Sequence, residues 1–204
     1  MPQLTDGAKN AMLDTLGGRN GFLSLHSGFP GTTGANELAG GSPAYARKAH
    51  TWNAAAGGVL DDSNAPVFDV PASTTVQYSG LWSLVTLGVF DGWVPLGATA
   101  DPFLFTAEDT TDVLTADGHG LADTTQVIVI DVGTSGALPT GLTEGTVYFV
   151  RDSTTDTFKL ALTSGGVAID LTTDGAGFVQ RILPEVFAAQ GTLTVTDTDI
   201  ALLA

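Results

Sequence analysis

Short apolar runs separated by turn residues recur along most of this chain of 204 residues. Runs such as GFLSLHS at 21–27 and TTVQYSGLWSL at 74–84 alternate in hydropathy, the period of a strand with one buried face. Glycine and threonine are abundant, whereas lysine and glutamate, which are common on exposed helices, are scarce. Strands that follow one another at short intervals are typical of sandwiches and barrels. The sequence therefore predicts a mainly β fold with a β-sandwich or jelly-roll-like domain.

One segment has the periodicity of a helix instead. Residues 4–16 place apolar side chains at three- and four-residue spacing, at Leu4, Ala8, Ala11, Met12 and Leu16. Thr5 or Asp6 suits the N-cap, and the Gly17-Gly18 pair suits the stop. We expect a short N-terminal helix that covers one end of the β structure.

The pattern changes from about residue 103 to a self-contained series of strands and turns. This part has its own apolar set, at Val113, Leu114, Leu121, Val127, Val129, Val147, Phe149, Phe158, Leu160, Ile169 and Phe178. The segment after it alternates again and ends in a strand that needs a partner sheet. The sequence therefore predicts a discontinuous β-sandwich docking domain from residues 1–102 plus 184–204. Residues 103–183 are expected to form a small inserted β module that projects from it.

Charge and composition argue against several classes of function. Seven Lys and Arg residues oppose 22 Asp and Glu residues, for a formal charge of −15. A nucleic-acid or anionic-membrane surface is bound by clustered cations, so neither is an expected partner. The chain has no cysteine, which excludes disulfides and thiolate metal sites. No signal peptide is recognisable at the N-terminus, so synthesis in a cytoplasm is expected.

A glycine-rich stretch at 25–49 ends at Tyr45, Arg47 and Lys48, where two of the few cations are adjacent. Its glycines lack the following Lys-Ser/Thr of a phosphate-binding loop, and no helical pattern comes after them. In so acidic a chain, a basic patch suits an acidic surface on another subunit. We predict a subunit contact at Tyr45, Arg47 and Lys48. Replacing Arg47 and Lys48 by Glu should then weaken assembly without unfolding the subunit.

No catalytic, cofactor-binding or metal-binding residue is predicted, and the chain is not expected to be an enzyme. The three histidines, His26, His50 and His119, lie in unrelated settings with no nucleophile-elbow motif, so structural or turn roles are expected. Asp197 and Asp199 share one face of a strand and could hold a cation, although solvated acids are the simpler expectation. No acidic segment has the spacing of a calcium-binding loop.

Aromatic side chains raise one further alternative, a platform for sugars. They are Trp52, Trp82, Trp93, Tyr45, Tyr78 and Tyr148. Most occupy alternating strand positions, where cores and subunit interfaces use such residues. A core or interface role is favoured, and a carbohydrate-binding module for a host surface stays open.

Three ordered motifs carry a resemblance to a known family. They are LHSG-P-GTTGANEL-GGSPAYAR, NAPVFDVPA-TTV and F-AQGTLTVTD, within residues 1–100 and 184–204. They resemble a family of tailed-bacteriophage virion proteins, common in phages of actinobacteria, that are labelled tail fibre, minor tail or virion structural proteins. The middle part, with DVLTADGHGLAD and TDTFKLALTSGG, is similar to a small β module found in many phage structural proteins.

The resemblance implies a non-enzymatic, homo-oligomeric virion subunit of the minor tail or tail-fibre type, with no cofactor. Its implied partners are copies of itself and other virion proteins, and its location is the virion after synthesis in the host cytoplasm. Capsid decoration, with the major capsid protein as partner, is the alternative. A module that binds host-surface glycans is a further one.

Overall fold

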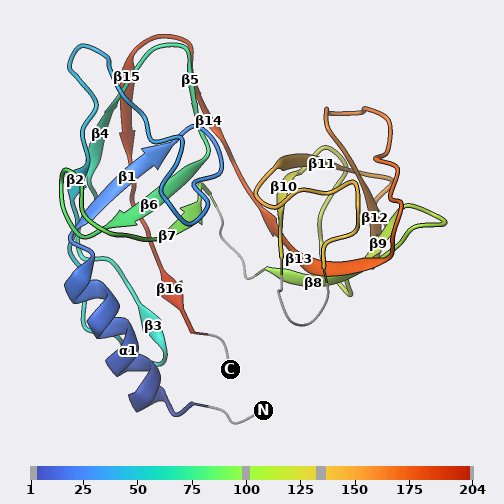
Figure 1. Ribbon diagram of the computed structural model, residues 1–204, viewed down its shortest axis with the longest axis horizontal. Coiled ribbons are helices and arrows are strands. Elements are labelled where there is room, and N and C mark those ends of the chain that lie inside the picture. Colours follow the sequence, from blue (N-terminus) through green and yellow to red (C-terminus); the bar gives the residue numbers. More distant parts are fainter. Residues whose placement is uncertain (1–3, 98–101, 132–136, 203–204) are drawn as a thin grey trace. The chain divides into compact units, whose positions relative to one another are not determined.

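The structure is a computed structural model that describes residues 4–97, 102–131 and 137–202 (Figure 1). It is mainly β with one N-terminal helix and a small inserted β barrel, so the fold class predicted from the sequence is confirmed. The chain divides into two compact units. The first unit is Met1–Val94 with Glu185–Ala204, and the barrel unit is Pro95–Pro184. The sequence had placed these boundaries at 102/103 and 183/184.

Helix α1 spans Asp6–Arg19. Thr5 is its N-cap, because the Thr5 hydroxyl accepts a hydrogen bond from the backbone N–H of Ala8 at 3.4 Å. The predicted stop at Gly17-Gly18 is wrong, since the helix continues through both glycines to a C-cap at Asn20. The Asn20 side-chain amide donates to the carbonyl of Leu16 at 3.0 Å, which satisfies one of the last helical acceptors.

The buried face of α1 differs from the predicted one. Leu13 and Lys9 are buried, whereas Leu4 and Met12 of the predicted stripe are 51% and 55% exposed. The helix packs against β3 on the side that carries Gly17. A Cβ atom on Gly17 would lie 3.2 Å from side-chain atoms of both Leu60 and Trp52, so glycine permits this close approach.

The first unit contains a four-stranded sheet with the order β2-β1-β6-β7. Its strands are β1 (Phe22–His26), β2 (Lys48–Ala49), β6 (Tyr78–Trp82) and β7 (Phe90–Pro95). Strand β1 is antiparallel to β6, with Phe22 opposite Trp82 and His26 opposite Tyr78. Every residue of β6 is buried, so this strand forms the centre of the unit.

Three two-stranded sheets pair the segment 59–76 with the C-terminal segment 185–201 within the first unit. They pair β5 (Thr74–Val76) with β14 (Glu185–Phe187), β4 (Val67–Val70) with β15 (Gly191–Thr194), and β3 (Val59–Leu60) with β16 (Ile200–Ala201). The C-terminal segment, red in Figure 1, therefore follows β5, β4 and β3 in turn. The sequence had predicted one closing strand, and the structure has three short ones.

The barrel unit contains a closed, six-stranded barrel with the order β10-β11-β12-β9-β8-β13. Its strands are β8 (Phe103–Glu108), β9 (Val113–Thr115), β10 (Gln126–Ile130), β11 (Val147–Arg151), β12 (Thr157–Ala161) and β13 (Gly175–Arg181). Side chains from all six strands form one apolar cluster, in which Phe105, Val127 and Phe158 are almost completely buried. Closure pairs every strand on both sides, so the barrel has no open edge.

Two strands of the barrel bury other residues than the apolar set expected from the sequence. The apolar set expected from the sequence included Val147 and Phe149 of β11 and Phe178 of β13. The residues of these strands that join the core cluster are Tyr148, Val150 and Val179. Both alternating sets of β11 are apolar, so hydropathy does not specify the face. The Tyr148 hydroxyl accepts the backbone N–H of Thr143 at 2.8 Å, which allows a tyrosine to be buried there.

Candidate functional site

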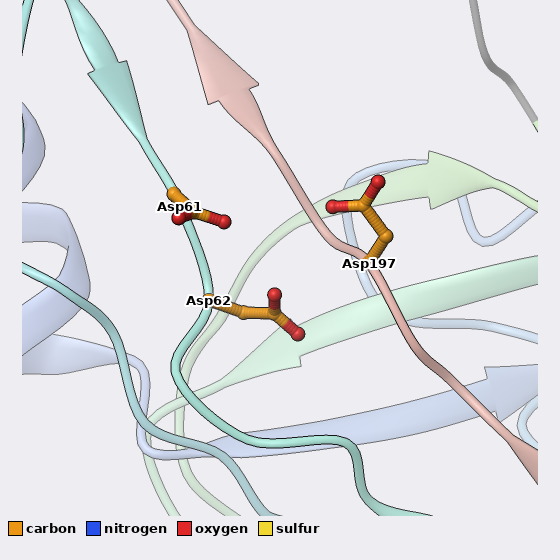
Figure 2. A group of neighbouring side chains, drawn as sticks. All are labelled: Asp61, Asp62 and Asp197. Atoms are coloured by element: carbon orange, nitrogen blue, oxygen red, sulfur yellow. The ribbon is translucent and has the colours of Figure 1, made fainter.

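Three carboxylates from distant parts of the sequence meet at one place in the first unit (Figure 2). Asp61 and Asp62 directly follow β3, and Asp197 precedes β16. Because β3 pairs with β16, their carboxylate oxygens lie within 4.8 Å of one another. From the sequence, Asp197 and Asp199 were considered as a pair that could hold a cation. The contribution of Asp61 and Asp62 was not predicted, because it depends on the pairing of β3 with β16, which are far apart in the sequence.

Asp61, Asp62 and Asp197 form what we call the acidic cluster, and Asp62 is its partly buried member. Burial, and then the charges of Asp197 and Asp61, raise the pKa of Asp62 above its usual value. Burial and the same two neighbours also raise the pKa of Asp199. One oxygen of Asp62, Oδ2, is buried with no hydrogen-bond partner among the described residues. Carboxylate oxygens are ligands for hard divalent cations, but exposed carboxylates are also common on acidic surfaces that bind no metal.

Arg47, one of the predicted contact residues, is held within its own chain. Its Nε and Nη2 atoms donate to the two carboxylate oxygens of Glu37 at 2.8 and 2.7 Å. The guanidinium carbon lies 3.4 Å from the ring centroid of Trp82, a cation–π contact. With 9% of its side chain exposed, Arg47 forms a nearly buried bidentate ion pair.

The other two predicted contact residues also have partners within the chain. The Tyr45 hydroxyl accepts the backbone N–H of Leu25 at 2.8 Å and donates to Glu37 at 3.4 Å. Burial raises the pKa of Tyr45, so it remains a neutral donor. The ammonium of Lys48 lies 3.4 Å from Asp69 Oδ2. A contact of Tyr45, Arg47 and Lys48 with a neighbouring subunit stays a prediction.

Arg47 also anchors the segment 83–89 between β6 and β7, which we call the apolar loop. Its Nη1 atom donates to the backbone carbonyls of Leu84 at 3.0 Å and Leu87 at 2.6 Å. The same guanidinium therefore joins Glu37, the Trp82 ring and two carbonyls of the loop.

The apolar loop exposes large side chains in a defined conformation. They are Leu84, Val85, Leu87 and Val89, of which Leu87 is 86% exposed. Two hydrogen bonds close the loop, from Ser83 N–H to the Val89 carbonyl at 3.0 Å and from Val89 N–H to the Ser83 hydroxyl at 2.8 Å. Leu87 has a left-handed backbone with φ of 57°, which is unfavourable for leucine. This loop was not among the sites predicted from the sequence, although its run SLVTLGV, with four large apolar residues and no charge between two strands, was a usable signal.

His26 belongs to a buried polar network at the centre of the sheet. Its Nε2 atom lies 2.6 Å from the Ser24 hydroxyl, and its Nδ1 atom lies 2.7 Å from the Ala35 carbonyl. A carbonyl only accepts, so Nδ1 carries the proton and Ser24 donates to Nε2. Trp82 Nε1 donates in turn to the Ser24 oxygen at 2.9 Å. Ser24 and His26 have no exposed surface, so this serine–histidine pair is closed to a substrate.

His119, expected in a turn, is buried in the barrel unit. Its Nδ1 atom accepts the backbone N–H of Leu121 at 3.0 Å, and its ring packs edge-on against Phe158 at 4.9 Å between centroids. It therefore contributes to the core of the barrel and not to a site on its surface.

His50 lies beside a cavity in the first unit. It is 3% exposed, and neither ring nitrogen has a hydrogen-bond partner among the described residues. Burial lowers the pKa of His50 to about 4, so its ring is neutral at physiological pH. The Trp52 ring packs perpendicular to it at 4.3 Å, and Trp52 Nε1 donates to the Asn20 carbonyl at 2.9 Å.

The cavity has a volume of about 400 Å³. Its lining residues are Asp14, Gly17, Gly18, His50, Thr51, Trp52, Asn53, Ala54 and Leu60. Among the aromatics considered as a sugar platform, Tyr78, Trp82 and Tyr148 are buried, whereas Trp52 lines this cavity.

Comparison with known proteins finds no match among family models, curated proteins or solved structures. The likeness to phage virion proteins therefore rests on the sequence motifs alone. Within the described ranges, no helix has the length and apolar character needed to cross a bilayer.

Proposed function

We propose that the chain is a non-enzymatic structural subunit of a bacteriophage virion, which assembles with copies of itself through its first unit. The motifs in residues 1–100 and 184–204 support the virion role, and they favour a minor tail or tail-fibre position over capsid decoration. The observation that carries the assembly role is the apolar loop, which Arg47 holds in an exposed and defined conformation.

Exposed apolar side chains are ordinary when they are scattered, but a contiguous group marks an interaction surface. The apolar loop concentrates such side chains over seven residues and includes Leu87 in an unfavourable backbone conformation. A preformed loop loses little conformational entropy when it is covered by a partner. Both features are expected of a surface that is buried after assembly.

A second copy of the chain is the partner that the charge distribution favours. Copies that each carry a formal charge of −15 repel one another unless they meet at a neutral surface. Residues 83–89 contain no ionisable side chain, and the adjacent Arg47 is neutralised by Glu37. The apolar loop is therefore a place where two copies can meet without adding to this repulsion.

Two measurements test the proposal together. Light scattering coupled to size-exclusion chromatography should give a molar mass that is a multiple of 20.8 kDa and that persists in high salt. Mass spectrometry of purified particles should then detect the protein in the virion. A strict monomer at all concentrations, together with absence from particles, would contradict the proposal.

A further inference from the structure

We propose that the cavity between the C-terminal half of α1 and residues 50–54 binds a guanidinium or ammonium group. The group would come from a small organic cation or from a basic side chain of another protein. This inference does not depend on the virion role. It follows from the cavity's hydrogen-bonding groups, its aromatic wall and the charge around it.

The size of the cavity suits such a group. About 400 Å³ lies within the range of small-ligand sites and exceeds the volume of one arginine side chain. Leu60 and Trp52 contribute apolar surface to the lining, and Asp14, Asn53 and His50 contribute polar atoms. An aliphatic stem with a cationic head matches this division.

Asp14 and Asn53 each keep one side-chain oxygen that can accept a further hydrogen bond. One oxygen of Asp14 accepts the backbone N–H of Ala55 at 2.7 Å, and its second oxygen has no partner within the described part of the chain. The side-chain NH₂ of Asn53 donates to Asp61 Oδ2 at 3.1 Å and to the Asp62 carbonyl at 2.8 Å. The side-chain oxygen of Asn53 is therefore left to accept a hydrogen bond from a ligand. A ligand with several N–H donors would satisfy both acceptors.

Electrostatics specify a positive charge on that ligand. Gly17 and Gly18 belong to the last turn of α1, where the helix dipole places negative partial charge. The carboxylate of Asp14 adds a full negative charge, and the acidic cluster lies directly beyond Asn53. His50 is neutral and so does not oppose a cation. An anionic ligand would be repelled from the same place.

The chain already contains an occupied site of this chemistry. At Arg47, a guanidinium contacts a tryptophan ring and forms a bidentate pair with the Glu37 carboxylate. The cavity offers the same kinds of group, the Trp52 ring and the Asp14 carboxylate, with no cation of this chain among its lining residues. Arg19, the cation nearest to the cavity in sequence, is paired with Asp91.

The test compares two probes of nearly equal shape. Capped arginine amide and capped citrulline amide differ in that a guanidinium is replaced by a neutral urea. In NMR titrations of the whole chain, the arginine probe should bind about tenfold more tightly than the citrulline probe. The signals of Gly17, Gly18 and the Trp52 indole N–H should shift.

Asp14→Asn is the decisive variant, because its remaining oxygen can still accept the Ala55 N–H. It should weaken arginine binding about five- to tenfold. Asp6→Asn is the matched control, since it removes the same charge from the first turn of the same helix, and it should change binding less than about twofold. Thermal unfolding of each variant checks that α1 is intact.

A peptide arm distinguishes the sources of the cation. A short peptide with one central arginine that binds more tightly than the capped amide indicates a protein side chain, and equal affinity indicates a small cation. The proposal is overturned by equal binding of the citrulline probe or a neutral hexose, by equal effects of the two aspartate variants, or by no shift at about 50 mM probe.

Discussion

The two units of the molecule differ in how many polar side chains they bury. Of the eight buried polar or charged residues among those described, seven lie in the first unit and only His119 lies in the barrel unit. The seven are Lys9, Asn20, Ser24, His26, His50, Ser79 and Thr198. The barrel closes its strands on one another around an apolar cluster, whereas the first unit combines short two-stranded sheets, a cavity and the apolar loop. The barrel has the features of a self-sufficient fold, and the first unit has those of a binding surface.

Each unit contains an arginine that pairs with a carboxylate and donates to a loop carbonyl, but the two arginines differ in exposure. In the barrel unit Arg151 donates to the carbonyl of Gly166 and pairs with Asp152, in the way that Arg47 holds the apolar loop. The Arg151 side chain is 31% exposed and that of Asp152 is 55% exposed, against 9% for Arg47. Burial strengthens an ion pair that is fully hydrogen-bonded and makes its loss more costly.

The largest difference is therefore expected between Arg47→Met and Arg151→Met. Removing Arg47 leaves Glu37 without its bidentate partner and frees two loop carbonyls, which should cost roughly 2–4 kcal/mol of unfolding free energy. Removing Arg151 should cost no more than about 1 kcal/mol, because its ion pair is exposed. Urea unfolding of each variant measures both values. Equal losses would show that burial does not separate the two arginines.

This expectation changes the one drawn from the sequence. Replacing Arg47 by Glu would place two carboxylates together at a nearly buried position, so the variant should unfold before its assembly can be assessed. Lys48→Glu alone keeps the Arg47 network and is the better probe of the predicted basic contact.

Acid should weaken the first unit through its buried histidines. Burial holds the pKa of His50 at about 4, below the ordinary value of 6.5, and lowers the pKa of His26 as well. As the pH falls from 6.5 toward 4, these histidines bind protons in the unfolded chain but remain neutral in the folded chain. Their contribution to the free energy of unfolding is therefore fully present above pH 6.5 and is lost as the pH drops toward 4. His50→Leu should remove roughly 1–3 kcal/mol of this dependence between pH 7 and pH 4. Unfolding free energies that depend equally on pH in both proteins would refute the role of His50.

The acidic cluster should act in the opposite direction and more weakly. The raised pKa of Asp62 gives stability that is present below the ordinary pKa of an aspartate and is lost as the pH rises through the raised value. Asp62→Asn should therefore stabilise the protein at pH 7 by roughly 0.5–1 kcal/mol, and the gain should shrink in acid. Asp117→Asn, at an exposed turn of the barrel unit, is the matched control and should change stability by less than about 0.5 kcal/mol. A gain of the same size in both variants would mean that net charge, and not the cluster, is responsible.

The fold class could be predicted because hydropathy alternation and turn residues are local signals. The face of β11 could not, since Val147 and Tyr148 are both apolar enough for the core and only the barrel geometry selects one set. The face of α1 was also mispredicted, because the fit of Gly17 against Leu60 and Trp52 outweighs the more apolar stripe.

The candidate sites depend still more on contacts between distant segments. Adjacent cations at Arg47 and Lys48 are visible in the sequence, but their partners Glu37 and Asp69 are not. The acidic cluster requires the pairing of β3 with β16, two strands that are separated in the sequence by the whole inserted barrel. Local patterns thus located the residues of interest and left their partners undetermined.

Sedimentation equilibrium tests most directly whether the apolar loop of the first unit joins copies of the chain. Leu87→Asn removes the most exposed side chain of the loop and suits its left-handed backbone, because asparagine tolerates that conformation. Val167→Asn removes an equally exposed side chain, 87% against 86%, from the barrel unit. We predict that the wild-type chain and Val167→Asn self-associate alike and that Leu87→Asn does so at least about tenfold more weakly. Equal association of all three proteins, or equal weakening by both variants, would contradict the claim.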